Sequence, residues 1–346
     1  MRRSVSRRTF VAAGGAAVAS MALAACGGGA QGGQSAAANS ATGSAGVTNK
    51  ITFCLDWAPN TNHTGVYVAQ NKGYFADEGL DVQIVQPAED GAEAMIGTGQ
   101  AQLGVSFQDY IAGALASGNT GLTAVAAIIQ HNTSGIMSRK EDGITRPAAM
   151  EGHTYATWEL PIEQATLKQV VQKDGGDYSK IKLVPNTVDD EVGALKAKMF
   201  DSVWVYEGWS VQNAHVKNFD VNYFSFISID EVFDYYTPVI AANMEFAKKN
   251  PEAVKGFLRA AKKGYEFAIS NPDDAAQILC DAVPELDAAL VKQSQAFLAG
   301  QYTADAASWG VIDGERWKRF FTWLNDNKLV EGTLDVNAGW TMDYLQ

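Results

Sequence analysis

The chain has 346 residues, 47% of them hydrophobic, and a formal net charge of −12. This acidity argues against a nucleic-acid partner, because affinity for nucleic acid comes from Lys and Arg side chains that neutralise phosphates. The hydrophobic content is sufficient for a packed core, and the part from residue 50 onward is long enough for two domains.

The first 25 residues have the pattern of an export signal. Arg7 and Arg8 precede an apolar run rich in Gly and Ala at 9–25, as in a twin-arginine signal peptide. The tetrapeptide Leu23–Cys26, LAAC, resembles the lipobox of bacterial lipoproteins, which predicts cleavage before Cys26 and lipidation of its sulfur. A membrane-spanning helix is the alternative, but the run is about as short as a span can be.

Residues 26–49 are dominated by Gly, Ser and Ala. Such a segment cannot bury enough apolar surface to order itself, so we expect a flexible tether. The leader carries four arginines and no acidic residue, so the mature chain has a net charge near −16. These features predict an extracytoplasmic protein that is anchored to the plasma membrane through lipid on Cys26.

Short apolar runs alternate with amphipathic segments in two sets. In the first, strands are expected at 51–57, 81–86, 101–106 and 122–130, and helices at 63–75, 91–100 and 108–118. In the second, strands are expected at 153–158, 181–185, 201–207, 221–226 and 237–243, and helices at 161–175 and 189–199. Strands that alternate with helices are typical of parallel sheets with right-handed crossovers.

From Asn250 onward the pattern is almost wholly helical. Pro251, Pro272 and Pro284 stand where helices could begin, because proline is tolerated in the first turn of a helix.

The expected fold is therefore α/β, with two lobes, parallel-rich sheets, two crossover strands and a helical C-terminal region. Lobe I would comprise residues 50–132 and 240–346, and lobe II residues 133–239. Chain crossings near 130–136 and 235–243 would make a hinged clamshell. Ligands of open parallel sheets bind beyond the carboxyl ends of the strands, so the cleft would collect those ends from both lobes.

The loop after the first strand, DWAPNTNH, would lie at the mouth of this cleft. Trp57 offers a flat stacking face, Asn60 an amide and His63 a hydrogen-bonding ring. Core packing is the open alternative for Trp57. Asn62 is expected to cap the helix that begins near His63.

Further candidate ligand contacts follow other strands or lie at the crossings: Glu89, Asp90, Gln108, His131, Asn132, Trp158, Glu163, Tyr206, Glu207, Trp209 and Tyr235. For Asp90, helix capping is the open alternative. For the histidines, a structural hydrogen bond is more common than a reactive role.

The residue types in these turns indicate the class of ligand. Aromatic, amide and acidic side chains are frequent, whereas Lys and Arg are nearly absent, so an anionic ligand is disfavoured. An aminopyrimidine fits, because its ring nitrogen and amino group can make a two-point hydrogen bond to a carboxylate. Glu207, flanked by Tyr206 and Trp209, is the first choice for that carboxylate; a surface ion pair or a helix cap is its alternative role.

No metal or cofactor is predicted. The chain has four histidines and neither a CxxC nor an HExxH motif. Cys54 and Cys280 lie in apolar contexts, and free thiols are expected there rather than a disulfide.

Several stretches are familiar: LDWAPNTNHTGVYVAQNKGYF, EDGAEAM, IIQHNTSG, PIEQA and YYTPV. They resemble the substrate-binding lipoproteins of ABC importers that take up thiamine pyrimidine precursors, of the formylaminopyrimidine or hydroxymethylpyrimidine type. The resemblance spans about residues 51–345. It implies a type II periplasmic-binding fold, no catalysis, and a monomer that delivers its ligand to a permease and its ATPase.

The resemblance also carries individual residues. It maps the aromatic and amide positions of the first loop onto Trp57 and Asn60, and a later binding turn onto Tyr206–Trp209. Many relatives have an aromatic residue where Glu207 stands, so riboflavin, another flat heterocycle or a sulfonate remain alternative ligands.

The family is related to the fungal thiamine-pyrimidine synthases and, more distantly, to alkanesulfonate- and taurine-binding proteins. The synthases consume a histidine and a lysine-bound pyridoxal phosphate, and depend on a cysteine-rich iron-binding segment. The present sequence has no such cysteine cluster, so an enzyme is not expected.

Overall fold

The computed structural model describes residues 49–346 except residues 120 and 187. The predicted signal peptide, Cys26 and most of the predicted tether lie outside these residues. Among the helices of the described part, none has both the length and the apolar character needed to cross a membrane.

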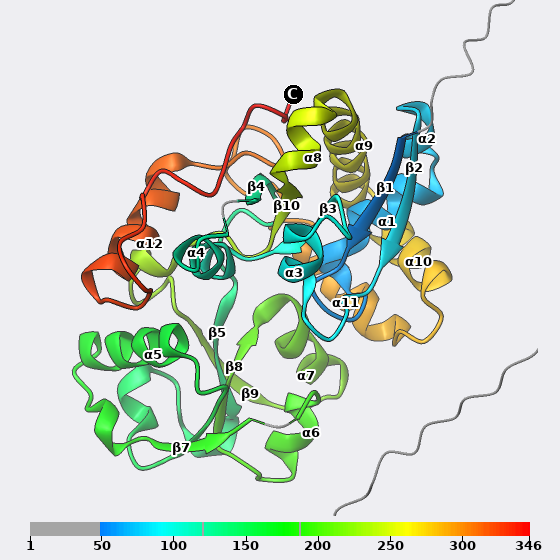
Figure 1. The fold of residues 1–346 in the computed structure, drawn as a ribbon. Coiled ribbons are helices and arrows are strands. Elements are labelled where there is room, and N and C mark those ends of the chain that lie inside the picture. The colour runs from blue at the N-terminus through cyan, green and yellow to red at the C-terminus, as the bar shows by residue number, and fades with distance from the viewer. Residues whose placement is uncertain (1–48, 120, 187) are drawn as a thin grey trace, which may run out of the picture. The chain divides into compact units, whose positions relative to one another are not determined.

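Two mixed five-stranded sheets organise the described chain (Figure 1). The first sheet has the strand order β2-β1-β3-β10-β4, and the second β7-β6-β8-β5-β9. We call each sheet with its helices a lobe, lobe I and lobe II. The strands are β1 (Asn49–Cys54), β2 (Leu80–Val85), β3 (Leu103–Ser106), β4 (Leu122–Ala127), β5 (Ser134–Arg139), β6 (Thr154–Thr157), β7 (Lys182–Pro185), β8 (Ser202–Tyr206), β9 (Val221–Ser225) and β10 (Val239–Asn243).

Helices cover both sheets. Those of lobe I are α1 (Thr64–Asn71), α2 (Tyr74–Asp77), α3 (Ala92–Gly97), α4 (Gln108–Ala116), α8 (Met244–Lys249), α9 (Pro251–Ser270), α10 (Pro272–Ala282), α11 (Ala288–Leu298) and α12 (Gly314–Asp326). Those of lobe II are α5 (Pro161–Lys173), α6 (Glu191–Lys196) and α7 (Gln212–Val216). The expected α/β fold with two lobes and a helical C-terminal region is confirmed.

Each sheet contains one strand that runs against its neighbours. In lobe I, β1 is parallel to β2 and β3, whereas β10 is antiparallel to β3 and β4. In lobe II, β6 is parallel to β7 and β8, whereas β5 is antiparallel to β8 and β9. Strand β5 differs from the prediction, which placed no strand there. All six of its residues are buried, but the polar residues of the first crossing directly precede it.

The chain crosses between the lobes twice, once from β4 to β5 and once from β9 to β10. Asn132 in the first crossing ties the two together: its Nδ2 donates to the Phe233 carbonyl at 2.8 Å, and its N–H donates to Asp234 at 3.1 Å. The second crossing also packs against α12, where the rings of Tyr235 and Phe320 stack with centroids 4.0 Å apart. Hydrogen bonds therefore tie the first crossing to the second, and aromatic packing ties the second crossing to α12.

The C-terminal helices begin largely as expected. Pro251 and Pro272 are the first residues of α9 and α10. The expectation for Pro284 is wrong: it lies in a turn, and α11 begins at Ala288 because the Asp287 side chain caps the first turn. Cys54 and Cys280 are free thiols, as expected, and Cys54 is buried.

Helices α1 and α9 cross at two glycines. A Cβ atom on Gly65 would enter the ring of Tyr265, and one on Gly264 would collide with the Gly65 carbonyl oxygen. Only residues without a side chain allow the two backbones to approach so closely. This contact fixes the start of α1, which follows directly on the loop between β1 and α1.

Candidate functional site

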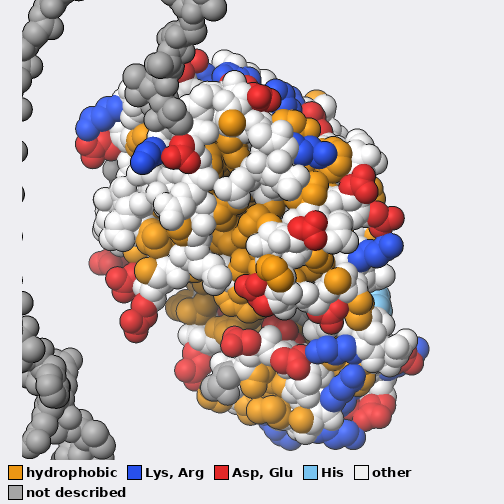
Figure 2. Space-filling model, turned by 90° about the vertical axis from the view of Figure 1, so that its right-hand side faces the viewer, with side chains coloured by type: hydrophobic (Ala, Val, Ile, Leu, Met, Phe, Trp, Pro, Cys, Tyr) orange, Lys and Arg blue, Asp and Glu red, His pale blue; other side chains and the backbone are white. Residues whose placement is uncertain are grey.

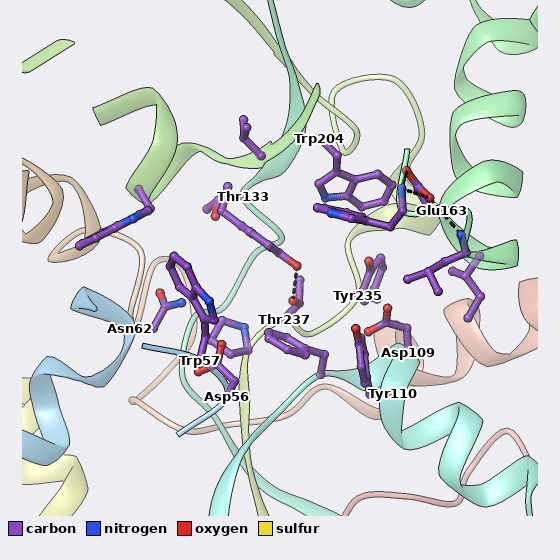
Figure 3. A pocket seen from close by; sticks show the side chains of 18 of the residues that line it. Asp56, Trp57, Asn62, Asp109, Tyr110, Thr133, Glu163, Trp204, Tyr235 and Thr237 are labelled. Carbon is purple, nitrogen blue, oxygen red and sulfur yellow. Dashed lines mark hydrogen bonds between the residues drawn. The ribbon is translucent and has the colours of Figure 1, made fainter. Parts of the chain in front are cut away.

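A cavity of about 1030 Å³ lies between the lobes and draws its lining from both (Figure 3). Figure 2 shows the hollow on one face of the molecule, with hydrophobic and acidic side chains around it. Among the described residues, the lining contains no Lys, Arg or His. It contains eight aromatic and six acidic side chains: Trp57, Phe107, Tyr110, Trp158, Trp204, Tyr206, Trp209 and Tyr235, with Asp56, Asp109, Glu163, Asp189, Glu191 and Glu331.

The loop after β1 is held by hydrogen bonds to its backbone. Asn60 caps the 3-10 turn Thr61–His63: its Oδ1 accepts the N–H of Asn62 at 2.9 Å. The hydroxyl of Tyr302 donates to the Thr61 carbonyl at 2.6 Å, and that of Tyr265 to the Asn62 carbonyl at 2.7 Å. The expected cap was Asn62; the cap is Asn60, and the Asn62 side chain is left at the cavity.

His63 does not line the cavity but orients a residue that does. It is fully buried, and its Nδ1 accepts the N–H of Asn60 at 3.1 Å. The ring proton is therefore on Nε2, which donates to Asp56 Oδ1 at 2.6 Å. Asp56 follows β1 at the cavity wall, so a neutral histidine fixes the orientation of a cavity carboxylate.

Trp57 presents its ring to solvent at the cavity. The residue is 46% exposed, which excludes the core-packing alternative. Trp158 and Tyr110 also line the cavity and are 43% and 48% exposed. Exposed rings gathered around one hollow are typical of a ligand-binding surface.

Glu163 lines the cavity, but its carboxylate already accepts hydrogen bonds from groups of the protein. It accepts the Tyr155 hydroxyl at 2.7 Å, the Thr157 hydroxyl at 3.0 Å and the N–H groups of Trp158 and Leu160 at 3.1–3.2 Å. Four donor groups saturate its acceptor sites. Glu163 therefore holds the Trp158 turn at the start of α5 in place, and is poorly suited to contact a ligand.

Asp109 is a cavity carboxylate that sequence reasoning missed. It is the second residue of α4, one position beyond Gln108, and lies beside Tyr110 and Tyr235 (Figure 3). Burial raises the pKa of Asp109 to about 7, and the nearby Glu93 acts in the same direction, against backbone N–H groups that lower it. None of the ion pairs among the described residues involves this carboxylate.

Lobe II contributes Tyr206 and Trp209. The Tyr206 hydroxyl shares a hydrogen bond of 3.3 Å with Thr237, between the last residue of β8 and the second crossing. A π-helical turn, Glu207–Val211, follows β8 and brings Gly208 and Trp209 to the cavity. Glu207 is half-buried outside the lining, and burial raises the pKa of its carboxyl.

Half of the candidate residues line the cavity, and the others lie elsewhere. The lining candidates are Trp57, Asn60, Trp158, Glu163, Tyr206, Trp209 and Tyr235. Those outside the lining are His63, Glu89, Asp90, Gln108, His131, Asn132 and Glu207.

Most residues outside the lining have structural partners. The Gln108 side chain is buried between the Trp317 carbonyl and the Tyr236 N–H. His131 contacts Asp234 at 2.8 Å and Asp305 at 2.9 Å, at the first crossing.

Glu89 and Asp90 are exposed in the turn before α3. Their position after β2 put them among the candidates, but the turn does not reach the cavity lining.

The two arginines nearest to the first crossing in sequence do not line the cavity. Arg139 is buried against Asp201 at 2.5 Å and Asp142 at 2.7 Å. Arg146 pairs with Asp174 at 2.7 Å. The cavity wall is consequently acidic and aromatic, which suits a ligand rich in N–H donors or carrying positive charge.

Comparison with known proteins places the chain. The model of the family described as NMT1/THI5 like matches residues 60–275. A formylaminopyrimidine-binding protein of Halalkalibacterium halodurans is 29% identical over 284 residues, covering 80% of this chain and 85% of that protein. The 4-amino-5-hydroxymethyl-2-methylpyrimidine phosphate synthase THI11 of Saccharomyces cerevisiae is 26% identical over 251 residues, covering 69% and 73%.

Among solved structures, the periplasmic aliphatic sulphonate binding protein SsuA of Escherichia coli superposes with a TM-score of 0.67 at 15% identity, covering 86% of this chain and 99% of that one. The expected periplasmic-binding fold is thereby confirmed. Since the family model covers more than half of the sequence, this chain belongs to the NMT1/THI5-like family.

Proposed function

We propose that the protein is the extracytoplasmic solute-binding component of an ABC importer, and that its ligand is a thiamine pyrimidine precursor of the formylaminopyrimidine or hydroxymethylpyrimidine type. The observation that carries this proposal is the cavity lining, in which aromatic and acidic side chains are frequent and, among its described residues, no Lys, Arg or His occurs. The relative from H. halodurans, named for binding formylaminopyrimidine, supports the same class of ligand.

The first loop supplies the contacts for one ring. Trp57 offers a face for stacking, and the Asp56 carboxylate beside it, oriented by His63, can accept an N–H from the amino group and a second one from the neighbouring ring nitrogen when that nitrogen is protonated. The Asn62 amide can serve a ring substituent as donor or acceptor. Asp56 thus takes the role first expected of Glu207, which lies outside the lining.

Delivery to a permease would use closure of the lobes. In the proposed arrangement residues 50–132 and 240–346 move against residues 133–239 about the two crossings, and a ligand that contacts both halves favours the closed state. The protein acts as a monomer in this scheme, with permease and ATPase subunits as partners.

Membrane attachment belongs to the same proposal. The twin-arginine signal directs export, and lipid on Cys26 holds the protein at the outer face of the plasma membrane by the tether at 26–49. Cys26→Ser should release the protein from the membrane fraction into the medium. Retention of that variant in membranes would argue for a different anchor.

Two alternative functions are weighed against the cavity. A synthase that uses lysine-bound pyridoxal phosphate needs a lysine at the site, and no described lining residue is a lysine, so the residues present do not fit that cofactor. A sulfonate binder needs cationic groups, which the described lining also lacks. The proposed function is therefore binding without catalysis.

Calorimetric titration of the purified protein tests the proposal. Formylaminopyrimidine or hydroxymethylpyrimidine should bind with micromolar or tighter affinity, while taurine should give no binding heat. Binding of taurine alone, or of riboflavin alone, would replace the pyrimidine by that class of ligand.

A further inference from the structure

The cavity has two ends, each with its own rings and carboxylate. Figure 3 shows Asp56, Trp57 and Asn62 together on one side, and Asp109, Tyr110, Tyr235 and Trp204 together on the other. Thr237 lies between the two groups, where its hydroxyl shares a hydrogen bond with Tyr206. We call the first group the Trp57 end and the second the Asp109 end.

The size of the cavity exceeds what one ring needs. Its volume of about 1030 Å³ is at the upper limit of the range that holds drug-sized ligands, roughly 300–1,000 Å³. With the lobes as they stand, a single substituted pyrimidine at the Trp57 end would not fill this volume.

The carboxylates of the two ends differ in their partners. Asp56 accepts a hydrogen bond from His63 at 2.6 Å, and Glu163 is saturated by four donor groups. For Asp109, the hydrogen bonds and ion pairs of the described residues include no side-chain donor and no cation. Burial without a countercharge is also what raises the pKa of this carboxyl to about 7. A positively charged ligand group would supply the missing partner.

Two pairs of aromatic rings, one from each lobe, line the cavity, and Figure 3 shows one ring of each pair, Tyr110 and Trp204, on the side of Asp109. Phe107 and Tyr110 in lobe I lie with ring centroids 5.4 Å apart, and Trp158 and Trp204 in lobe II with centroids 6.0 Å apart. All four line the cavity. Aromatic faces attract cations through their quadrupole, most strongly when water is excluded, so these rings and the carboxylate favour the same kind of group.

We propose that the Asp109 end is a second subsite, which binds a positively charged ring or amine joined to the pyrimidine. Beyond single pyrimidines, the cavity would then accept a two-part molecule, with a flat aminopyrimidine at the Trp57 end and a cationic group that pairs with Asp109. This inference rests on the proposed function, because the Trp57 end must hold the pyrimidine.

Three probes separate the two ends in calorimetric titrations of the full-length protein in detergent. Thiamine carries a cationic ring on the aminopyrimidine, hydroxymethylpyrimidine lacks a second ring, and 4-amino-5-benzyl-2-methylpyrimidine has an uncharged ring in its place. Thiamine should bind at least about ten-fold more tightly than either other probe, since attraction of its cationic ring to the Asp109 carboxylate and to aromatic faces would supply roughly that much. Asp109→Asn should remove this advantage and leave the other two affinities within about three-fold.

A matched control is Glu89→Gln, which removes one negative charge from an exposed position outside the cavity lining. It should leave all three affinities unchanged. Melting temperatures of both variants show that they are folded.

The outcomes distinguish the two proposals. If hydroxymethylpyrimidine binds but thiamine binds no more tightly than the benzyl analogue, or Asp109→Asn weakens all three probes equally, the second subsite is wrong and the pyrimidine site stands. If neither pyrimidine probe nor thiamine binds, the proposed function fails, and the subsite fails with it.

Discussion

His63 Nε2 donates to Asp56 Oδ1 at 2.6 Å, while His63 Nδ1 accepts the backbone N–H of Asn60 at 3.1 Å. The two contacts join the end of β1, the first loop and the start of α1 into one unit. They also explain why a fully buried histidine stands in a loop at a cavity it does not touch. The histidine is a positioning residue for the carboxylate that we assign to the pyrimidine.

Asp56→Asn should weaken binding of hydroxymethylpyrimidine about ten-fold or more, because a charged hydrogen bond contributes about 1.5–3 kcal/mol. The matched control is Glu207→Gln, which makes the same chemical change outside the cavity lining and should leave the Kd unchanged. Calorimetry measures both. A larger loss for Glu207→Gln than for Asp56→Asn would return the role to Glu207.

His63→Phe should also weaken hydroxymethylpyrimidine binding by about ten-fold, because the Asp56 carboxylate loses the donor that orients it. His63→Gln retains a donor at the side-chain end and should restore part of the affinity. A purely structural role for His63 predicts that affinity follows the melting temperature in both variants. If His63→Gln and His63→Phe lower the Tm equally but His63→Gln binds the pyrimidine more tightly, His63 acts by positioning Asp56.

Trp57→Ala should lower pyrimidine affinity by roughly ten-fold through loss of stacking, with little change in Tm, because 46% of the residue is exposed. The buried Trp317 of α12 is the contrasting case. Trp317→Ala should cost about 3–5 kcal/mol of unfolding free energy. Thermal unfolding followed by circular dichroism separates the two. A large loss of Tm in Trp57→Ala would mean that its ring serves the fold.

Asp109→Asn should change stability in a pH-dependent manner. The folded pKa of Asp109, about 7, lies above the value of unfolded aspartate, about 3.9, so the folded state retains a proton that the unfolded chain has lost between these pH values. The contribution of this group to stability therefore falls as pH rises through that window. The variant should melt near the wild-type temperature at about pH 4 and above it at about pH 8. An equal difference in Tm at both pH values would contradict this assignment.

The alternation of apolar runs predicted the lobes and most strands, because buried strands and amphipathic helices leave distinct periodicities. The pattern could not predict strand direction. The sequence of β10 is as apolar as that of a buried parallel strand, yet β10 is antiparallel to β3 and β4. The pattern did not predict strand β5, because the polar residues of the first crossing directly precede it and hide its start. The residues of β5 are buried because the strand lies between β8 and β9, not because its own sequence is uniformly apolar.

The candidate site shows a similar limit. Strand ends identified the correct loops, but not which side chain of each loop faces the ligand. Asp56 and Glu207 both follow strands, and only the π-helical turn after β8, which has no clear sequence signal, takes Glu207 out of the lining. Asp109 was missed by one position, since a step of one residue along α4 turns the side chain by about 100°. Trp204 could have been found, because it precedes Tyr206 by two residues on the same face of β8.

Gly264→Ala should destabilise the protein by about 1–3 kcal/mol or more, because the new methyl group would meet the backbone carbonyl of Gly65, which has no freedom to move aside. Separation of α9 from α1 would also disturb the first loop, since Tyr265 on α9 donates to the Asn62 carbonyl at 2.7 Å. Weaker pyrimidine binding should therefore accompany the loss of stability.

Gly256→Ala is the matched control in the same helix. Its methyl group would make an ordinary contact, 3.4 Å from the Glu78 side chain, and alanine favours a helix interior over glycine by up to about 1 kcal/mol. Chemical denaturation should thus show a neutral or stabilising effect for Gly256→Ala and a clear loss for Gly264→Ala. Equal stabilities for the two variants would mean that α1 and α9 do not depend on a close backbone contact, and that the first loop is positioned by its hydrogen bonds alone.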